Sequence, residues 1–135
     1  MLNYQIEKNL SVEEFIEVLV NSTLSERRPV NEPERIAKML EHGNLMVTAR
    51  FNEKLVGVAR SLTDFFYCTY LSDLAVDSNF QKQGIGKELI RQTKLSTPKA
   101  KLILLAAPKA INYYSKIGMT RHENCYFLDD INNLK

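Results

Sequence analysis

The sequence has 135 residues, of which 44% are hydrophobic and 25% charged, and its formal net charge is +2. This length and composition are typical of one globular domain that can bury a core without disulfides or metals. The near balance of basic and acidic residues argues against a protein dedicated to nucleic acid or to an anionic membrane surface. We therefore expect a single domain over residues 1–135, with no nucleic-acid partner and no membrane partner.

The cysteines and the first residues indicate where such a chain resides. Cys68 and Cys125 lie far apart and form no CxxC or Cys/His ligand spacing, so they favour a reducing compartment and no metal site. The opening stretch, MLNYQIEKNL, lacks the apolar segment of a signal peptide. The apolar run at residues 102–107 is too short to span a bilayer. We expect a cytoplasmic protein.

The first half of the chain predicts a strand, two helices and a hairpin. Ser11 and Glu14 form a capping box, in which each side chain satisfies a backbone N–H at a helix start. Pro33 suits the first turn of a second helix, and Gly43, which can adopt a left-handed conformation, ends that helix. Asn52-Glu53 separates two apolar runs as a hairpin turn. The expected elements are a strand at 4–6, a helix from 11 to about 21, a helix from about 31 to 42, and a hairpin within 44–62.

The second half alternates strands with helices. Its composition predicts that the apolar run at 101–106 is a strand buried on both faces. Gly118 stops a short helix. The expected elements are strands at 69–76, 101–106 and 125–128, and helices at 86–96 and 109–117. The whole order, β-α-α-β-β-β-α-β-α-β, predicts an α/β or α+β domain with a single mixed, mostly antiparallel sheet flanked by helices.

The turn Gly84-Ile85-Gly86 joins a strand to a helix between Lys82 and Lys87. A helix start exposes N–H groups with a partial positive charge, and glycines keep side chains away from them, so this turn can hold a diphosphate. The alternative is a plain strand-to-helix turn with a capping glycine. A P-loop would need glycine at Gln81, and a dinucleotide fingerprint would need glycine at Leu89, so neither motif is present.

The segment Gln81-Lys82-Gln83-Gly84-Ile85-Gly86 resembles the (Gln/Arg)-x-x-Gly-x-(Gly/Ala) motif of the GNAT superfamily of N-acetyltransferases. Upstream, LSDLAVDSNF resembles the strand that precedes this motif. Downstream, AINYYSKIGM resembles the family's Ala-x-x-(Phe/Tyr)-Tyr-x-x-x-Gly-(Phe/Met) helix. Gly57 lies where the family often has a glycine in its third strand. The clear match covers residues 73–119, about a third of the chain.

The resemblance implies a GNAT-like acyl-CoA N-acyltransferase fold and an N-acetyltransferase activity. Such an enzyme moves an acetyl group from acetyl-CoA to a primary amine of a small molecule or peptide, by direct attack of the amine on the thioester. In the family, the co-substrate lies where the fourth and fifth strands separate, with its pantetheine arm on the fourth strand and its diphosphate in the glycine turn. The implied cofactor-binding residues are Leu74, Ala75, Val76, Gln81, Lys82, Gln83, Gly84, Ile85, Gly86 and Lys87.

Two catalytic residues follow from the same resemblance. Tyr114 matches the family's general acid, which protonates the departing CoA thiolate, and Tyr113 is its substitute; helical spacing alone equally suits either ring as a core residue. Asp73 is the carboxylate nearest the implied reaction centre. It is either the base, directly or through water, or a structural residue that holds a strand bulge. Weaker candidates, more simply explained as solvated charges or helix-start carboxylates, are Glu26, Glu32 and Glu34.

Other positions leave the acceptor open. Ala107 stands where many family members carry an asparagine that contacts cofactor or substrate. Arg27 and Arg28 are expected to lie in a solvated loop, with binding of an acceptor carboxylate or phosphate as the alternative. Two other functions stay open: a non-catalytic CoA-binding or regulatory module on the same fold, and an interaction domain whose glycine turn binds nothing. Dimers are frequent in the family, so a homodimer is a further implied partner.

Overall fold

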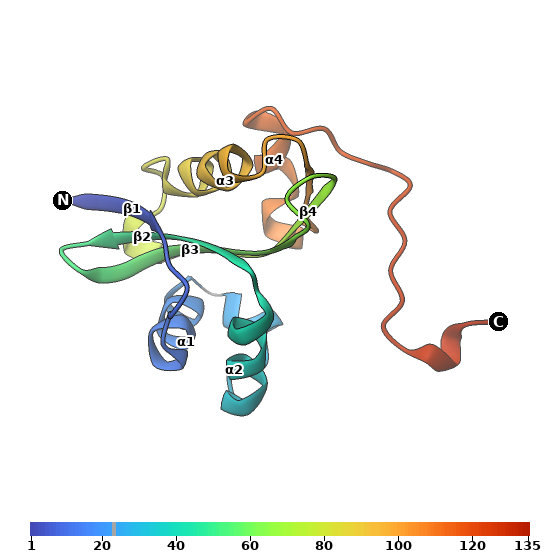
Figure 1. Cartoon of the computed structure of the whole chain (residues 1–135), viewed down its shortest axis with the longest axis horizontal. Helices are drawn as coiled ribbons and strands as arrows, with labels where there is room; N and C mark the ends of the chain where they lie inside the picture. Colours follow the sequence, from blue (N-terminus) through green and yellow to red (C-terminus); the bar gives the residue numbers. More distant parts are fainter. Residues whose placement is uncertain (23) are drawn as a thin grey trace. The chain divides into compact units, whose positions relative to one another are not determined.

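A computed structural model describes residues 1–22 and 24–135 (Figure 1). The chain divides into two compact units, Met1–Leu105 and Ala106–Lys135. The single domain expected over residues 1–135 stays a prediction. Across the described residues, none of the helices has the length and apolar character that crossing a bilayer requires.

The first unit is built on a five-stranded sheet with the strand order β1-β2-β3-β4-β5. Strands β1 to β4 pair antiparallel with their neighbours, and β5 pairs in parallel with β4. Asn52 and Glu53 both have positive φ and form the tight turn between β2 and β3, as predicted. The mixed, mostly antiparallel sheet is therefore confirmed. The strands are β1 (Leu2–Ile6), β2 (Leu45–Phe51), β3 (Lys54–Thr63), β4 (Cys68–Val76) and β5 (Lys101–Ile103).

Helices cover both faces of this sheet (Figure 1). Helices α1 (Val12–Asn21) and α2 (Pro33–His42) pack on one face, around Phe15 and Ile36, and helix α3 (Ile85–Ser96) packs on the other, through Ile85 and Leu89. Short 3-10 helices η1 (Leu24–Arg27) and η2 (Ser78–Phe80) lie in the connections before α2 and α3. The sheet is thus buried between two apolar clusters, one on each face.

The predicted helix boundaries follow their local signals. The Oγ of Ser11 accepts the backbone N–H of Glu14 at 3.1 Å, which confirms the cap of α1. Pro33 is the first residue of α2. Gly43 ends α2, but its backbone is extended, with φ of −78°, so the expected left-handed conformation is wrong. Glycine is required there for space instead, because a Cβ would lie 2.9 Å from the Cγ of Arg60.

Strand β5 is shorter and less buried than the sequence predicts. It ends at Ile103 rather than at residue 106, and only Leu102 of its three residues is half-buried, against the α3 cluster. Lys101 and Ile103 point away from that cluster and are exposed. The expectation of a strand buried on both faces is therefore wrong, because β5 is the last strand in the sheet order and is covered on one face.

The second unit contains the short 3-10 helices η3 (Pro108–Ala110) and η4 (Ile131–Asn133) and helix α4 (Ile111–Lys116). The predicted short helix is confirmed, and Gly118 ends it with a left-handed φ of 101°. The strand predicted at 125–128 is wrong: no strand occurs in residues 106–135, and Tyr126 and Phe127 are 93% and 75% exposed. Aromatic residues favour a strand only where a neighbouring strand pairs with it, and no strand pairs with this segment.

Candidate active site

Strand β4 has a partner on both sides over only part of its length. On one side it pairs with β3 from residue 69 to residue 76. On the other side it pairs with β5 only at residues 68–70. In the described part of the chain, no strand pairs with the β5-facing edge of residues 74–76. An extended ligand can hydrogen-bond to such an edge as an added strand, so the segment predicted to bind pantetheine lies on an open strand edge.

An extra residue in β4 lies just before this open edge. Asp73 is opposite Arg60 and Leu71 is opposite Ser61, so Ser72 has no partner on β3 and forms a bulge. The bulge reverses the alternation of faces along the strand. Leu71 therefore packs on the α3 face, whereas Asp73 faces the other side of the sheet, toward α2 and η1.

Asp73 is fully buried and is held by Arg60, the residue opposite it on β3. The Nε–H of Arg60 donates to one carboxylate oxygen of Asp73. The same guanidinium donates to the Oγ of Ser72 and to the carbonyl of Met39, each at 3.1 Å. A carboxylate without access to water is stable only when charged donors satisfy it, and Arg60 supplies the first of these.

A second guanidinium, that of Arg28, reaches Asp73 from the segment after η1. Its Nε–H donates to the other carboxylate oxygen of Asp73, and its terminal N–H groups donate to the carbonyl of Ser72 at 2.7 Å and to the carbonyl of Arg27 at 2.8 Å. We call Arg28, Arg60, Ser72 and Asp73 the Asp73 cluster. The cluster ties η1 and the end of α2 to the bulge of β4.

This geometry bears on both roles predicted for Asp73. Asp73 lies beside the bulge and pairs with Arg60 on β3, which suits a residue that holds the bulge in place. Both oxygens accept a guanidinium N–H, but each keeps a further acceptor site. Asp73 can therefore take a proton only through an ordered water at a remaining lone pair, or after one guanidinium has moved away.

The sequence contained a signal for one of these arginines and none for the other. Arg60 lies in the apolar run VGVARSL, and a charged residue within a buried strand indicates a buried partner. Arg28 was expected to be solvated, which is wrong: its side chain is 21% exposed and contacts a residue 45 positions away. No local pattern reveals a partner at that separation.

The predicted diphosphate turn lies between η2 and α3. Gly84 is the N-cap of α3 with a left-handed φ of 83°, and Lys82 also has a positive φ, of 64°. The first helical bond runs from the N–H of Glu88 to the carbonyl of Gly84 at 3.0 Å, so the amides of residues 85–87 have no carbonyl of the helix to which they can donate. Gly84, with its left-handed backbone, directly precedes these amides, and turns of this kind can bind an anion.

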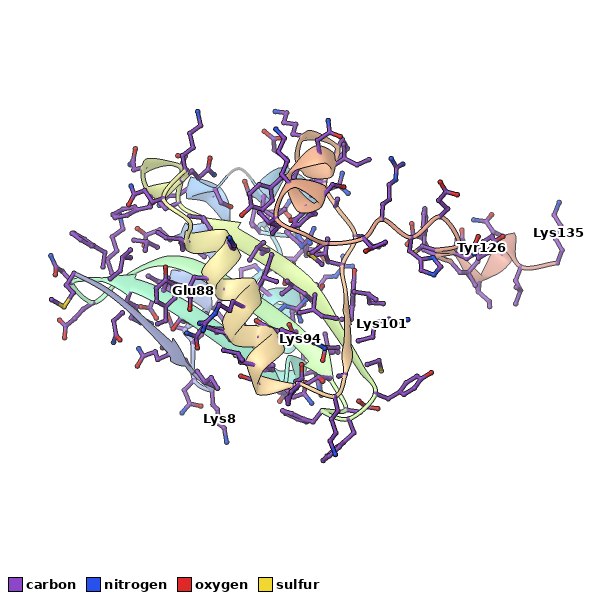
Figure 2. All side chains as sticks on the ribbon, turned by 90° about the horizontal axis from the view of Figure 1, so that it is seen from above. Lys8, Glu88, Lys94, Lys101, Tyr126 and Lys135 are labelled. Carbon is purple, nitrogen blue, oxygen red and sulfur yellow. The ribbon has the colours of Figure 1, made fainter. Side chains whose placement is uncertain are left out.

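The side chains around this turn favour a negatively charged ligand. Lys82 and Lys87 are exposed, and neither takes part in an ion pair within the described residues. Glu88, at the start of α3, is the nearest acid in sequence, and its carboxylate accepts N–H groups from Arg91 at 3.1 Å and from Gln92 at 2.7 Å. Figure 2 shows Glu88 near the beginning of α3 and Lys94 toward its end. The carboxylate of Glu88, which would repel a phosphate, is therefore hydrogen-bonded to side chains of its own helix.

Asp77, which sequence analysis did not single out, fixes the start of this turn. It is almost fully buried, and its carboxylate accepts the N–H of Asn79 at 2.9 Å. Its own backbone N–H donates to the carbonyl of Val56 at 2.8 Å, and the side-chain Nε2 of Gln81 donates to the carbonyl of Val76 at 3.1 Å. These bonds connect the open edge of β4 to the turn. An aspartate directly after a strand is the signal that would have identified it.

The predicted general acid, Tyr114, belongs to the second unit and lies on α4. Its ring contacts that of Tyr113 edge to face, with 5.2 Å between the centroids. Burial raises the pKa of the Tyr114 hydroxyl above the ordinary value for tyrosine, and the neighbouring Tyr113 raises it further. Tyr113 is more exposed, and burial raises its pKa as well. Tyr114 therefore keeps its proton at neutral pH, as a proton donor must.

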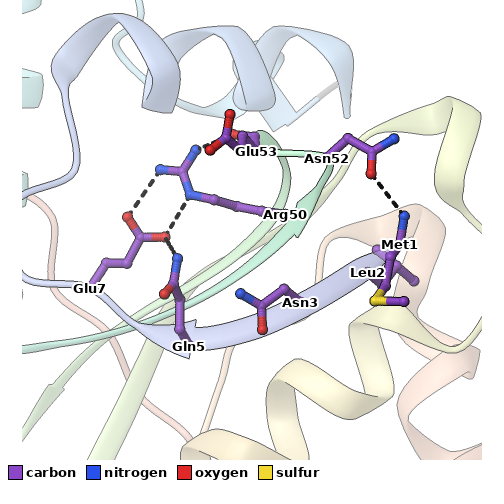
Figure 3. A pocket seen from close by; sticks show the side chains of 8 residues that line it. All are labelled: Met1, Leu2, Asn3, Gln5, Glu7, Arg50, Asn52 and Glu53. Carbon is purple, nitrogen blue, oxygen red and sulfur yellow. Dashed lines mark hydrogen bonds and ion pairs between the residues drawn. The ribbon is translucent and has the colours of Figure 1, made fainter.

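A shallow pocket of about 610 Å³ lies elsewhere on the first unit, between β1 and the turn joining β2 to β3 (Figure 3). Arg50 lines it, and its guanidinium donates to the carboxylates of Glu7 and Glu14 and to the carbonyl of Glu53. The residues lining this pocket include none from 73–76 or 81–87. Within residues 1–22 and 24–135, no group of three or more His, Cys, Asp or Glu side chains could hold a metal ion.

An open edge on β4, a bulge before it and a glycine turn after it agree with the acyl-CoA-dependent acyltransferase fold that the motifs imply. The family model for the Acetyltransferase (GNAT) domain matches residues 7–132. The chain therefore belongs to the GNAT family of N-acetyltransferases, which confirms the resemblance seen in its motifs.

Individual relatives agree with this assignment. A protein of Pyropia yezoensis named "Uncharacterized N-acetyltransferase ycf52" is 27% identical over 125 residues, which cover 84% of this chain and 67% of the relative. A GNAT family acetyltransferase structure from Streptococcus pneumoniae has a TM-score of 0.73 at 20% identity, over 97% of this chain and 98% of its own. A "predicted acetyltransferase" from Clostridium acetobutylicum, solved with acetyl-CoA, has a TM-score of 0.72 at 12% identity, over 96% of both chains. At these identities the two structures show a shared fold.

Proposed function

We propose that this N-acetyltransferase takes its acetyl group from acetyl-CoA and transfers it to a primary amine of a small molecule or peptide, by direct attack of the amine on the thioester. The observation that carries the proposal is the open edge of β4 at residues 74–76, followed directly by the Gly84 turn. The two features supply, in order along the chain, a surface for an extended amide-containing arm and a site for its diphosphate.

Main-chain groups do most of the binding in this proposal. The edge of Leu74, Ala75 and Val76 pairs with the pantetheine amides, and the free amides at the start of α3 hold the diphosphate. Lys82 and Lys87 add charge at short range. The residues proposed to bind acetyl-CoA are Leu74, Ala75, Val76, Gln81, Lys82, Gln83, Gly84, Ile85, Gly86 and Lys87.

The reaction then requires two proton transfers and one oxyanion donor. The neutral amine forms a bond to the thioester carbon, and the bond from that carbon to sulfur breaks. A backbone N–H of residues 74–76 donates to the carbonyl oxygen as negative charge develops on it. The ammonium proton leaves to a base, and the CoA thiolate receives a proton from an acid, so that the products are an amide and a free thiol.

Tyr114 is the proposed acid and Asp73 the proposed base. The raised pKa of Tyr114 supports its role, because a protonated phenol is available throughout the neutral range. For Asp73, the two guanidinium contacts favour proton uptake through an ordered water rather than by direct contact with the amine. Its alternative role, holding the bulge, keeps the oxyanion donor in place and needs no proton transfer.

Two measurements test the proposal together. Calorimetry should show saturable acetyl-CoA binding, and a screen for thiol release across amino acids, polyamines, aminoglycosides and peptide N-termini should give an acetylated product by mass spectrometry. Lys82→Glu should weaken binding about tenfold, whereas Lys99→Glu, the same change at an exposed lysine after α3, should leave it unchanged. Binding without turnover against any amine would identify a CoA-binding module, and the absence of binding would refute the proposal.

A further inference from the structure

Arg28 connects the loop after η1 to β4 through two hydrogen bonds, and a third bond holds its guanidinium to its own loop. Its guanidinium has five N–H donors, of which three are used, on Asp73, the Ser72 carbonyl and the Arg27 carbonyl. Two of these acceptors belong to the β4 bulge and the third to the loop itself. Because Asp73 directly precedes Leu74, the loop is fastened one residue before the open edge proposed to bind the co-substrate.

We propose that Arg28 is a positioning residue for acetyl transfer: it fastens the loop after η1 to the β4 bulge and thereby fixes the carboxylate of Asp73 and the amides that follow it. The inference rests on the proposed function, because it assigns the reaction to the edge of β4. This role differs from the acceptor binding that the sequence offered as an alternative for Arg28, because it acts through the β4 bulge.

The charge balance of the Asp73 cluster separates the roles of its two arginines. One buried carboxylate faces two guanidinium groups, so Arg60 alone is sufficient to neutralise Asp73. Arg60 is 7% exposed along its side chain and is opposite Asp73 in the sheet. Loss of Arg60 would leave a buried charge poorly compensated, and we expect it to impair folding. Loss of Arg28 leaves Asp73 paired with Arg60, without net charge, so the fold should survive. The change should then be in the geometry of the β4 bulge.

The bulge is the part of β4 whose geometry needs this support. Ser72 has no partner on β3, and its carbonyl accepts the terminal N–H of Arg28 at 2.7 Å. Without Arg28 the Ser72 carbonyl loses this bond, and the Asp73 carboxylate is held by Arg60 alone. Errors of about 1 Å in the placement of reacting groups can cost about 100-fold in rate, so a remote positioning contact has a large kinetic effect.

The test compares Arg28→Gln with Arg27→Gln in the full chain. Arg27 is the adjacent arginine and is exposed; its backbone carbonyl, which is unchanged in the variant, is the part that contacts Arg28. We expect Arg28→Gln to lower kcat about 10- to 100-fold while the acetyl-CoA Kd stays within about twofold. Arg27→Gln should keep the wild-type kcat, and any binding of the acceptor by Arg27 would change only the acceptor KM. Arg28→Lys keeps the charge but not the planar set of donors, so it should restore only part of kcat.

Hydrogen exchange supplies a readout that needs no acceptor. The amides of residues 72–74 should exchange about tenfold faster or more in Arg28→Gln than in Arg27→Gln, with equal global stability in the two variants. Equal exchange and equal kcat in both variants would overturn the inference, as would full recovery with lysine, because charge alone would then suffice. If no amine is acetylated by the wild type but the exchange difference is found, the proposed reaction fails while the fastening role of Arg28 stands.

Discussion

Gly57 on β3 and Leu89 on α3 lie so close together that even a Cβ on Gly57 would crowd the helix. A Cβ on Gly57 would lie 3.1 Å from the Cδ1 of Leu89 and 3.1 Å from the Cγ2 of Ile85. Ile85 is the first residue of α3 and directly follows the Gly84 turn. The absence of a side chain at Gly57 thus lets the start of α3, which follows the Gly84 turn, lie close to β3.

Replacing Gly57 with valine should displace α3. Overpacking of a filled core costs about 1–3 kcal/mol, and the displacement should also weaken acetyl-CoA binding because the turn moves with the helix. Thermal unfolding and calorimetry measure the two effects. Gly57→Ala combined with Leu89→Ala provides the control: the double variant should be more stable than the sum of the single changes predicts. Additive effects would mean that the two positions are not in contact.

Gly84→Ala separates backbone strain from steric clash. Nothing lies within 4 Å of a Cβ at this position, but φ is 83°, a conformation that costs an alanine about 1–2 kcal/mol. If the turn relaxes to relieve this strain, its amides no longer converge, so the acetyl-CoA Kd should rise about tenfold. Gly118→Ala, with φ of 101° and equally open space, is the matched control for strain. It should lose similar stability with an unchanged Kd, and an equal Kd in both variants would contradict the role of the turn.

Tyr114→Phe tests the proposed acid. The variant should lower kcat about tenfold or more with an acetyl-CoA Kd close to that of the wild type, since general acid catalysis contributes at the chemical step. Because the pKa of Tyr114 is raised, the wild type should show no loss of kcat from phenol ionisation between pH 7 and 9. Tyr113→Phe is the control and should keep full turnover. A greater loss in Tyr113→Phe than in Tyr114→Phe would reverse the assignment.

Features that depend on neighbouring residues were predictable from the sequence. The cap at Ser11, the turn at Asn52 and Glu53, and the left-handed Gly84 each follow from the side chains within a few positions. The glycine turn further indicated an anion site on general grounds, and the motifs on either side of it indicated the family. The order of elements up to α4 was correct for the same reason.

Features that depend on distant partners were not predictable. The bulge at Ser72 exists only through its register against β3, and Arg28 meets Asp73 across 45 positions. The strand expected at 125–128 had suitable residues but no strand beside it, since strand propensity without a partner is a weak signal. The candidate site combines both kinds of feature, so its turn was predicted and its Asp73 cluster was not.

Acid should weaken the fold through Arg50, at the pocket shown in Figure 3. Its guanidinium donates to the two carboxylate oxygens of Glu7 at 2.8 and 3.0 Å and to Glu14 at 2.8 Å, which ties β2 to the start of α1. Hydrogen bonds from Arg50 are the main reason that the pKa values of both carboxyl groups lie below the ordinary 4.5. Groups whose pKa is lowered by folding stabilise the native state above that ordinary value and cease to do so as pH falls through the lowered value.

Arg50→Gln should therefore cost stability at pH 7 and much less at pH 3. At neutral pH we expect a loss on the order of 1 kcal/mol, or roughly 3–5 °C in Tm for a chain of this size, because the network is partly solvated. As the pH falls from 7 toward 3, both carboxyl groups take up protons and their pairs with Arg50 weaken, so the difference in Tm should shrink. Arg35→Gln removes an exposed pair with Glu32, at 3.5 Å, and should shift Tm little at either pH. A Tm difference for Arg50→Gln that stays constant from pH 7 to pH 3 would show that packing of the arginine stem, not its ion pairs, stabilises this corner of the sheet.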